Sequence, residues 1–344
     1  MWIPGALQFL RHALLASALG LATAAAAADT GRIQVVFADP GASYSSYHAK
    51  LERLTVAAGR SWLQHLDGAA AVVDLTVSIG FASMPTASGR SVTSGPAGST
   101  ADGRTLWSQG AAYELRTGID PNGAAPDIEF LIGIDGYLQA ELWFDPDPLQ
   151  RSAAVPGHQT DAMTVLMHEF GHALGFNGWL DAASGAAPGR FLSTFDALVQ
   201  PMATPQGTAL FFTGAQAMAV HGGPVPLTLG SYTHLGNDVA GLGPDLVPDL
   251  MNGVVFDRGV RAGISALDLA MLSDTGLPVT LTAVPEPGVA MLLCVGVLPV
   301  LTVVWQRRRR ALAPVCAQPR KARAPRRRPA PARLGRPGRG KRCG

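Results

Sequence analysis

The region between residues 29 and 283 contains no cysteine. The three cysteines of the 344-residue chain are Cys294, Cys316 and Cys343, all of them nearer the C-terminus. This absence excludes a disulfide framework and a cysteine-ligated metal site from the region, and it leaves no thiolate there that could block a metal ion. A region of this length can bury a core of its own without disulfides.

Acidic residues are absent from the C-terminal end of the chain. From Arg307 onward there are 15 Lys and Arg residues and no Asp or Glu. The preceding residues therefore carry 12 basic against 25 acidic side chains, although the whole chain has a net charge of +2. The sequence describes an acidic domain followed by a basic tail. An acidic domain argues against nucleic acid as the main partner.

Residues 1–28 have the pattern of a secretory signal peptide. Arg11 and His12 precede the apolar run Ala13–Ala22, and the alanines of Ala24–Ala28 offer small-residue cleavage sites. The apolar run is too short to span a membrane comfortably, which favours cleavage over anchoring. We expect a mature chain that begins near Asp29 and is exported across the inner membrane.

A short motif near the middle of the chain carries the clearest chemistry. His168-Glu169-Phe170-Gly171-His172 has the pattern H-E-x-x-H. Helical spacing places His168 and His172 on one face, one turn apart, where two neutral imidazoles can hold one Zn²⁺ at about 2.0–2.1 Å each. Glu169 then lies beside the metal, where it can take a proton from a water molecule. The motif predicts a catalytic zinc site.

The residues around the motif predict the helix that it needs. Thr160 or Asp161 can cap the start of this helix, and Gly175 suits a left-handed residue at its end. Five apolar residues recur at helical spacing and form a stripe that faces the core, namely Met163, Leu166, Met167, Phe170 and Leu174.

A catalytic zinc ion needs a third protein ligand and an open position for water. The compact pattern that follows many such motifs would place a His at position 178, which is Gly178 here. There is no Glu between Glu169 and Glu286, which excludes the thermolysin type of site with a downstream Glu ligand. The remaining candidates are His221, His234 and an Asp such as Asp181.

These features resemble a leishmanolysin-type metzincin, in particular its exported bacterial relatives. The resemblance rests on H-E-F-G-H-A-L-G-F, a long insertion, the distant His234 and the D-L-M-N turn that contains Met251. It implies that His168, His172 and His234 bind one Zn²⁺, that Glu169 is the general base and that Met251 lies beneath the metal. It covers roughly Asp161–Pro278.

The resemblance also implies an activity, the hydrolysis of peptide bonds in a protein or peptide substrate. The alternative is a surface or extracellular-matrix protein that keeps a metzincin-like scaffold and cleaves nothing. The intact Glu169 argues against this alternative, because a purely structural metal site needs no base.

The remaining pattern predicts an α+β fold. A twisted N-terminal sheet and the zinc helix would form residues 29–176, and a loop-rich subdomain would form residues 177–283. Asp120, Asn122 and Asp127 fail the order of a calcium loop, so we interpret them as turn residues. The expected strands lie at Arg32–Ala38, at Ala71–Phe81 and in two stretches of Ile128–Phe144, I-E-F-L-I-G-I and L-Q-A-E-L-W-F. Helices are expected at Tyr47–Leu66 and Ile264–Thr275, the latter capped by Ser265, and a long surface loop at Pro85–Thr105.

The segment 284–310 resembles a PEP-CTERM sorting signal, which an exosortase processes in Gram-negative bacteria. Val-Pro-Glu-Pro at 284–287 precedes the mostly apolar residues 288–305 and then Arg307–Arg310. Eighteen such residues just cross the hydrocarbon of a bilayer, and the arginines favour the cytoplasmic side. We expect transient anchoring in the inner membrane, then release to the cell surface or matrix. Residues 311–344, rich in Pro and Arg, are expected to be disordered.

Overall fold

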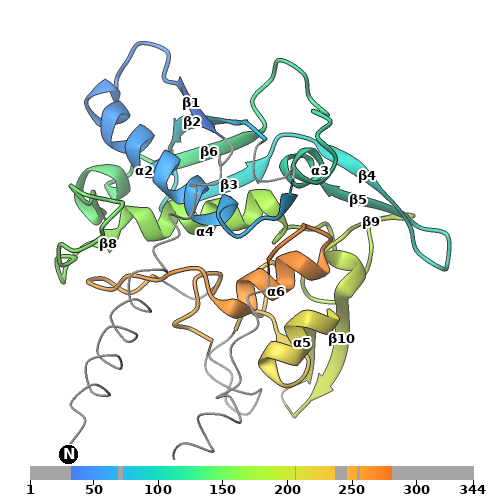
Figure 1. The fold of residues 1–344 in the computed structure, drawn as a ribbon. Helices are drawn as coiled ribbons and strands as arrows, with labels where there is room; N and C mark the ends of the chain where they lie inside the picture. The colour runs from blue at the N-terminus through green and yellow to red at the C-terminus, as the bar shows by residue number, and fades with distance from the viewer. Residues whose placement is uncertain (1–31, 69–72, 206, 237–245, 254–255, 281–344) are drawn as a thin grey trace, which may run out of the picture. The chain divides into compact units, whose positions relative to one another are not determined.

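A computed structural model describes residues 32–68, 73–205, 207–236, 246–253 and 256–280 (Figure 1). The predicted signal peptide (1–28), sorting signal (284–310), its apolar segment (288–305) and the basic tail (311–344) lie outside the described residues. Within the described ranges, no helix combines the length and the apolar character needed to span a bilayer.

A four-stranded sheet forms the N-terminal part of the structure. Its order is β1 (Ile33–Ala38), β2 (Leu75–Ala82), β6 (Ile128–Gly133) and β3 (Ala87–Ser91). The first three strands are parallel, and β3 pairs antiparallel with β6 at the edge of the sheet. Branched apolar residues alternate along β2 and β6, which is why these segments form strands with one buried face.

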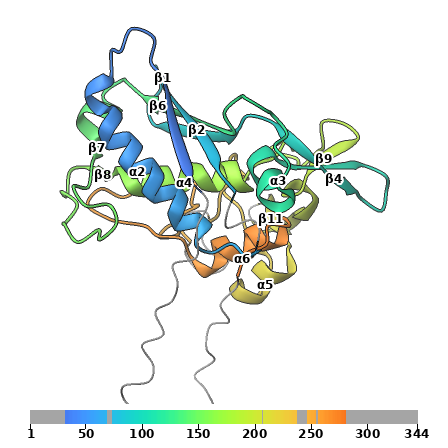
Figure 2. The same cartoon turned by 45° about the horizontal axis from the view of Figure 1, so that its top comes forward.

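Two helices cover this buried face, as Figures 1 and 2 show. They are α2 (Ser45–Leu63) and α4 (Ala162–Leu174), which contains the H-E-x-x-H motif. Gly59 of α2 lies against Ile33 of β1, and the ring of Phe170 of α4 meets Phe130 of β6 edge-on at 4.9 Å. The indole nitrogen of Trp62 donates to the Met167 carbonyl at 2.8 Å. These contacts hold the motif helix rigidly against the sheet.

The long loop predicted at Pro85–Thr105 is wrong. This segment contains β3 and β4 (Ser94–Ser99), and β5 (Thr105–Gln109) begins at its end. Its glycines permit close approach rather than flexibility. A Cβ at Gly89 would lie 2.6 Å from atoms of Glu169, and a Cβ at Gly95 would overlap the ring of Tyr113. Strands that pack this closely against their neighbours need glycine, which gives them an amino-acid composition that resembles that of a loop.

Two strands were predicted within Ile128–Phe144, and the first is confirmed as β6. Gly136 has a positive φ of 91° and turns the chain after this strand. The second prediction, at 138–144, is correct only for the two-residue strand β7 (Leu142–Trp143), because a π-helix, η2 (Tyr137–Glu141), precedes it. Hydrophobic alternation in this segment did not reveal the π-helix.

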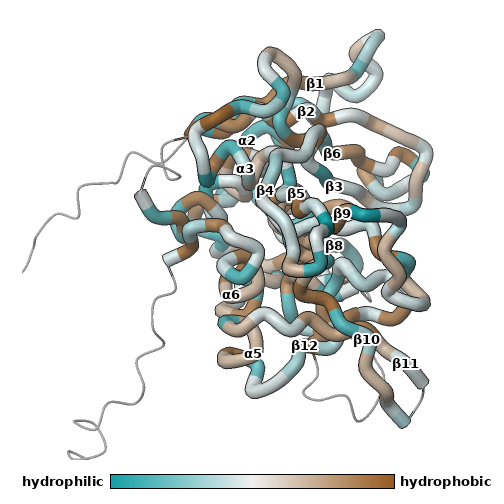
Figure 3. The backbone as a smooth tube through the Cα atoms, turned by 90° about the vertical axis from the view of Figure 1, so that its right-hand side faces the viewer, coloured by the Kyte–Doolittle hydropathy of each residue, from teal (hydrophilic) through white to brown (hydrophobic). Residues whose placement is uncertain are grey.

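The region after α4 is more ordered than the predicted loop-rich subdomain. β10 (Val199–Thr204) and β11 (Gly207–Phe212) pair as a hairpin, and β12 (Val225–Pro226) extends it. β9 (Phe191–Ser193) pairs with β5 of the N-terminal half. Figure 3 shows that apolar and polar bands alternate over short distances here, which hides the strands from a search for long apolar runs. The elements not yet named are α3 (Gly110–Thr117), β8 (Thr160–Asp161), η3 (Asp196–Leu198), α5 (Ala215–His221) and α6 (Ala266–Asp274).

The α+β class is confirmed, and so are the two predicted helices that flank the motif helix in sequence. They are α2 and α6, each displaced by one to three residues at its ends. Ser265 caps α6 as predicted, and Asp268 completes a capping box with it. The interpretation of Asp120 and Asn122 as turn residues is also confirmed, because the Asp120 carboxylate accepts the Asn122 and Gly123 amides at 2.8 Å each.

Candidate metal centre

The helix α4 begins as the sequence predicts and ends differently. The Asp161 carboxylate caps its start by accepting the Thr164 amide at 3.2 Å. Gly175 has φ 173°, which is extended backbone, so the predicted left-handed stop is wrong. Glycine is needed there for another reason. A Cβ at Gly175 would lie 2.6 Å from a methyl group of Leu272, so its absence lets α6 pack against the end of α4.

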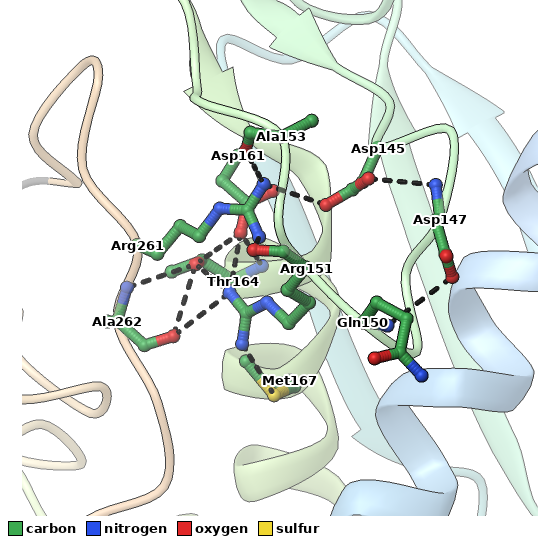
Figure 4. A network of polar contacts seen from close by, with 10 residues as sticks. All are labelled: Asp145, Asp147, Gln150, Arg151, Ala153, Asp161, Thr164, Met167, Arg261 and Ala262. Atoms are coloured by element: carbon green, nitrogen blue, oxygen red, sulfur yellow. Dashed lines mark hydrogen bonds and ion pairs between the residues drawn. The ribbon is translucent and has the colours of Figure 1, made fainter.

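A buried network of charges anchors the start of α4 (Figure 4). Arg151 donates to Asp161 at 2.7 Å, and Arg261 donates to Asp145 at 2.7 Å. Both carboxylates have no solvent exposure. Arg151 also reaches the Ala262 carbonyl at 3.3 Å, which ties the motif helix to the segment before α6. The two guanidinium groups and the two carboxylates have equal and opposite charges, so neither buried carboxylate lacks an ionic partner.

The structure brings three imidazoles together. The Nε2 atom of His172 lies 3.0 Å from the Nε2 atom of His168 and 3.0 Å from that of His234. His168 and His172 lie one turn apart on α4, and His234 comes from a loop 62 residues after His172. The three rings therefore present their Nε2 atoms to one common point, although they come from two separate parts of the chain.

The other ring nitrogen of each histidine contacts an oxygen acceptor. Nδ1 of His168 donates to the Leu250 carbonyl at 2.7 Å, and Nδ1 of His172 donates to the Phe176 carbonyl at 2.7 Å. Nδ1 of His234 lies 2.8 Å from the Ser231 hydroxyl and 3.2 Å from its carbonyl. A carbonyl can only accept, so the neutral rings carry their proton on Nδ1 and leave Nε2 with a bare lone pair.

Burial lowers the pKa of all three rings, and their mutual repulsion adds to this for His168 and His172. For His168 the pKa falls to about 3. The pKa values of His172 and His234 also lie below the ordinary value, with burial as the largest cause in both. All three rings are therefore neutral near pH 7, the form that binds a metal ion.

Met251 lies beneath the motif helix, fully buried. A Cβ on Gly171 would overlap its sulfur atom, so the glycine inside the motif makes room for the methionine. The carbonyl of Met251 accepts the Leu235 amide at 2.7 Å, next to His234, and the preceding Leu250 carbonyl accepts from His168. The backbone at Leu250 and Met251 therefore contacts His168 directly and His234 through its neighbour Leu235.

The structure explains why position 178 carries no histidine. A Cβ at Gly178 would overlap the Asp196 carboxylate and lie 2.6 Å from the Tyr232 hydroxyl. The buried Asp196 accepts the Trp179 amide at 2.9 Å and the Tyr232 hydroxyl at 2.8 Å. Tyr232 in turn accepts the Leu180 amide at 2.7 Å and lies two residues before His234. Sequence reasoning missed this pair, because no local pattern joins residues that are 36 positions apart.

The other candidate ligands lie elsewhere. His221 ends α5, and its Nδ1 atom lies 3.2 Å from the Gly223 carbonyl. Asp181 is exposed, and its carboxylate accepts the Ser184 amide and hydroxyl at 2.8 and 2.7 Å within a turn. Among the described residues, two groups of metal-ligating side chains converge. One is the three histidines, and the other is Glu114, Asp120 and Asp127, which is partly exposed and unrelated to the motif helix.

Glu169 lies beside the three histidines and is 4% exposed. Burial raises the pKa of its carboxyl to about 8, and a hydrogen bond from the Gly89 amide acts in the opposite direction. A cation at the histidines would lower this pKa by direct attraction.

The three histidines and Glu169 face one cleft of about 650 Å³. One wall is the edge strand β3, and another is η2. Opposite them, Phe256 meets the His168 ring edge-on at 4.8 Å, and Arg258 pairs with Glu141 across the cleft. The residues that line the cleft include Pro85, Thr86, Ala87, Ser88, Gly89, Asp135, Tyr137, Glu141, Val165, His168, Glu169, His172, His234, Asn252, Phe256 and Arg258.

The three imidazole nitrogens of His168, His172 and His234 converge, so this group could hold a metal ion. Comparisons of the chain with protein-family models, with curated proteins and with solved structures gave no match.

Proposed function

We propose that the chain is a zinc-dependent endopeptidase. The observation that carries the proposal is the convergence of three unprotonated Nε2 atoms, with 3.0 Å between neighbours. In the tautomers that the carbonyl partners of the Nδ1 atoms favour, the three Nε2 lone pairs point at one another and repel. A cation at their common point removes the repulsion. His168, His172 and His234 would be its ligands.

Imidazole donors suit several transition metals, and zinc is favoured by the three-nitrogen set with an open fourth position. When bound, the zinc ion would polarise the carbonyl of the substrate and lower the pKa of a water molecule. Glu169 would take the proton of that water as its oxygen attacks the carbonyl carbon. Glu169 would then deliver the same proton to the amine that leaves.

The shape of the cleft favours an extended polypeptide as the substrate. Among the described strands β3 lies at the edge of its sheet, with none of them paired to its outer side, and its residues Ala87, Ser88 and Gly89 line the cleft. An extended peptide can pair with such an edge through main-chain hydrogen bonds. Small side chains on β3 let the peptide approach closely. This supports cleavage within a chain, with the scissile bond above Glu169.

The test is the substitution Glu169→Gln. The amide cannot accept the proton, so hydrolysis of fluorescently labelled casein should fall by roughly 10²-fold or more. Zinc per chain, measured by atomic absorption, should stay at the wild-type level, because Glu169 binds no metal. A chelator should abolish the wild-type activity, and added zinc should restore it. Turnover near the wild-type rate in Glu169→Gln would contradict the proposed role of the base.

We also propose that the chain is exported and sorted as its termini suggest. The alanine tract before Asp29 and the segment 284–310 support this proposal. Mass spectrometry of surface-exposed protein should find an N-terminus within a few residues of Asp29 and no peptides from residues 311–344. Recovery of those C-terminal peptides from the cell surface would count against processing by an exosortase.

A further inference from the structure

One buried hydroxyl in the cleft has no hydrogen-bond partner among the residues that the structure describes. Tyr137 is 8% exposed and lines the cleft together with His168 and Glu169. Within the described ranges no side chain or backbone group hydrogen-bonds this hydroxyl, yet the oxygen is not sealed from the cleft. Tyr hydroxyls usually find a partner when they are buried. This one is therefore available to a ligand in the cleft.

The other buried tyrosine near the centre shows the contrast. The hydroxyl of Tyr232 donates to Asp196 at 2.8 Å and accepts the Leu180 amide at 2.7 Å. The protein uses both functions of that hydroxyl for structure. The Tyr137 hydroxyl makes neither kind of bond to the described residues, although Tyr137 is also buried.

The backbone holds Tyr137 in a fixed position. It is the first residue of the π-helix η2, which begins after the left-handed Gly136. The amides of Ala140 and Glu141 both donate to the Gly136 carbonyl, at 2.9 and 3.3 Å. Leu138, the next residue, is 1% exposed and anchors the turn in the core. π-Helices are rare and are often found at functional sites.

The electrostatic surroundings keep Tyr137 protonated. Burial raises the pKa of its hydroxyl well above the ordinary value, and the negative charges of Glu169 and Glu141 raise it further. The hydroxyl therefore keeps its proton near neutral pH and can donate a hydrogen bond.

We propose that Tyr137 is a catalytic residue that donates a hydrogen bond to the carbonyl oxygen of the scissile peptide bond. This inference rests on the proposed peptidase function. As the water oxygen bonds to the carbonyl carbon, the π electrons of the carbonyl move to its oxygen, and Glu169 takes the water proton. The Tyr137 hydroxyl, which keeps its own proton throughout, stabilises the charge on that oxygen. The C–N bond then breaks, and the nitrogen takes the proton from Glu169.

The test compares Tyr137→Phe with the wild-type protein, both loaded with zinc. Removal of one preorganised donor should lower kcat on labelled casein by about 10²-fold and leave KM nearly unchanged. A phosphinic peptide, built on a mapped casein cleavage site, carries a tetrahedral anion in place of the scissile bond. Its affinity, measured by calorimetry, should fall by a similar factor, because the donor acts on the tetrahedral state. Zinc per chain should not change.

Tyr47→Phe is the matched control. Tyr47 belongs to α2, packs against Phe144 and does not line the cleft. The Tyr47→Phe variant should therefore match the wild type in casein turnover and in affinity for the phosphinic peptide. Affinity of Tyr137→Phe for the phosphinic peptide within threefold of the wild type would overturn the inference. A loss of thermal stability in Tyr137→Phe would also overturn it, because it would reveal a structural partner. If the wild-type protein neither cleaves casein nor binds the phosphinic peptide, the proposed function itself fails.

Discussion

The contact between β3 and the motif helix allows one prediction to be worked out in detail. Gly89 faces α4, and a Cβ added there would lie 2.6 Å from both the Cβ and the carbonyl oxygen of Glu169. Ordinary contacts of a Cβ begin at 3.4 Å. The substitution Gly89→Ala must therefore separate the strand and the helix by about 0.8 Å. The neighbour is partly backbone, so no side-chain rotation can relieve the overlap.

Two effects of this separation can be measured. Overpacking of this kind typically costs about 1–3 kcal/mol of stability. The hydrogen bond from the Gly89 amide to the Glu169 carboxylate would also lengthen or break, which releases the base from its position. Displacement of a catalytic group by about 1 Å can lower the rate about 10²-fold. We therefore expect kcat/KM on labelled casein to fall by about that factor while zinc per chain stays constant.

Gly80→Ala is the matched control for this experiment. Gly80 lies inside β2 and outside the cleft, and its added Cβ would lie 2.9 Å from the end of the flexible Leu131 side chain. That side chain can rotate away, so this variant should keep its activity. If Gly89→Ala turns over casein within threefold of the wild type, the strand does not position the base and the reasoning is refuted.

Three further predictions concern the metal ligands, the buried charges and the pH dependence of stability. His234→Ala should lower zinc affinity by roughly tenfold to a hundredfold or more, whereas His221→Ala should leave zinc per chain unchanged; the opposite pattern in atomic absorption would refute the ligand assignment. Asp145→Ala should lower the free energy of unfolding in urea by up to about 3–5 kcal/mol, because it leaves the partly buried Arg261 guanidinium without its buried carboxylate partner; a loss below 1 kcal/mol would contradict this. Burial, followed by the charge of Asp127, raises the pKa of Glu114 to about 8, so the folded state holds a proton that the unfolded state releases above pH 4.5, and stability should fall as the pH rises from about 4.5 to 8. Glu114→Gln should remove part of this fall in melting temperature between pH 5 and pH 9, and an unchanged slope would show that another group causes it.

The motif helix could be predicted from the sequence almost to the residue. Apolar spacing over Met163–Leu174 and the cap at Asp161 are local signals, and the structure has its helix at Ala162–Leu174. The third histidine is a different case. Elimination left three candidates, and only the resemblance favoured His234. The structure brings His234 to the pair on α4, and its role as a ligand remains a prediction.

The predictions from the sequence were wrong at glycines that pack closely against residues far away in the chain. The many glycines and serines at 85–105 predicted a loop, but this segment forms strands in which Gly89 and Gly95 lie against Glu169 and Tyr113. Gly175 read as a left-handed stop, but it makes room for Leu272. In each case the reason for the glycine is a partner far away in the sequence. No periodicity within one segment can reveal such a partner.

The hydrogen bond from His168 to the Leu250 carbonyl has a consequence for the order of folding. It joins residues 82 positions apart, and His234 comes 62 positions after His172. Closing loops of this length costs several RT of chain entropy, which grows with the logarithm of the loop length. The helix that places His168 and His172 one turn apart can form early in folding, because a helix needs only local contacts. The complete ligand set exists only after the long loops have closed. Metal capture should therefore be a late kinetic step, and a refolding chain given zinc at different delays should show a lag before the ion becomes resistant to a chelator.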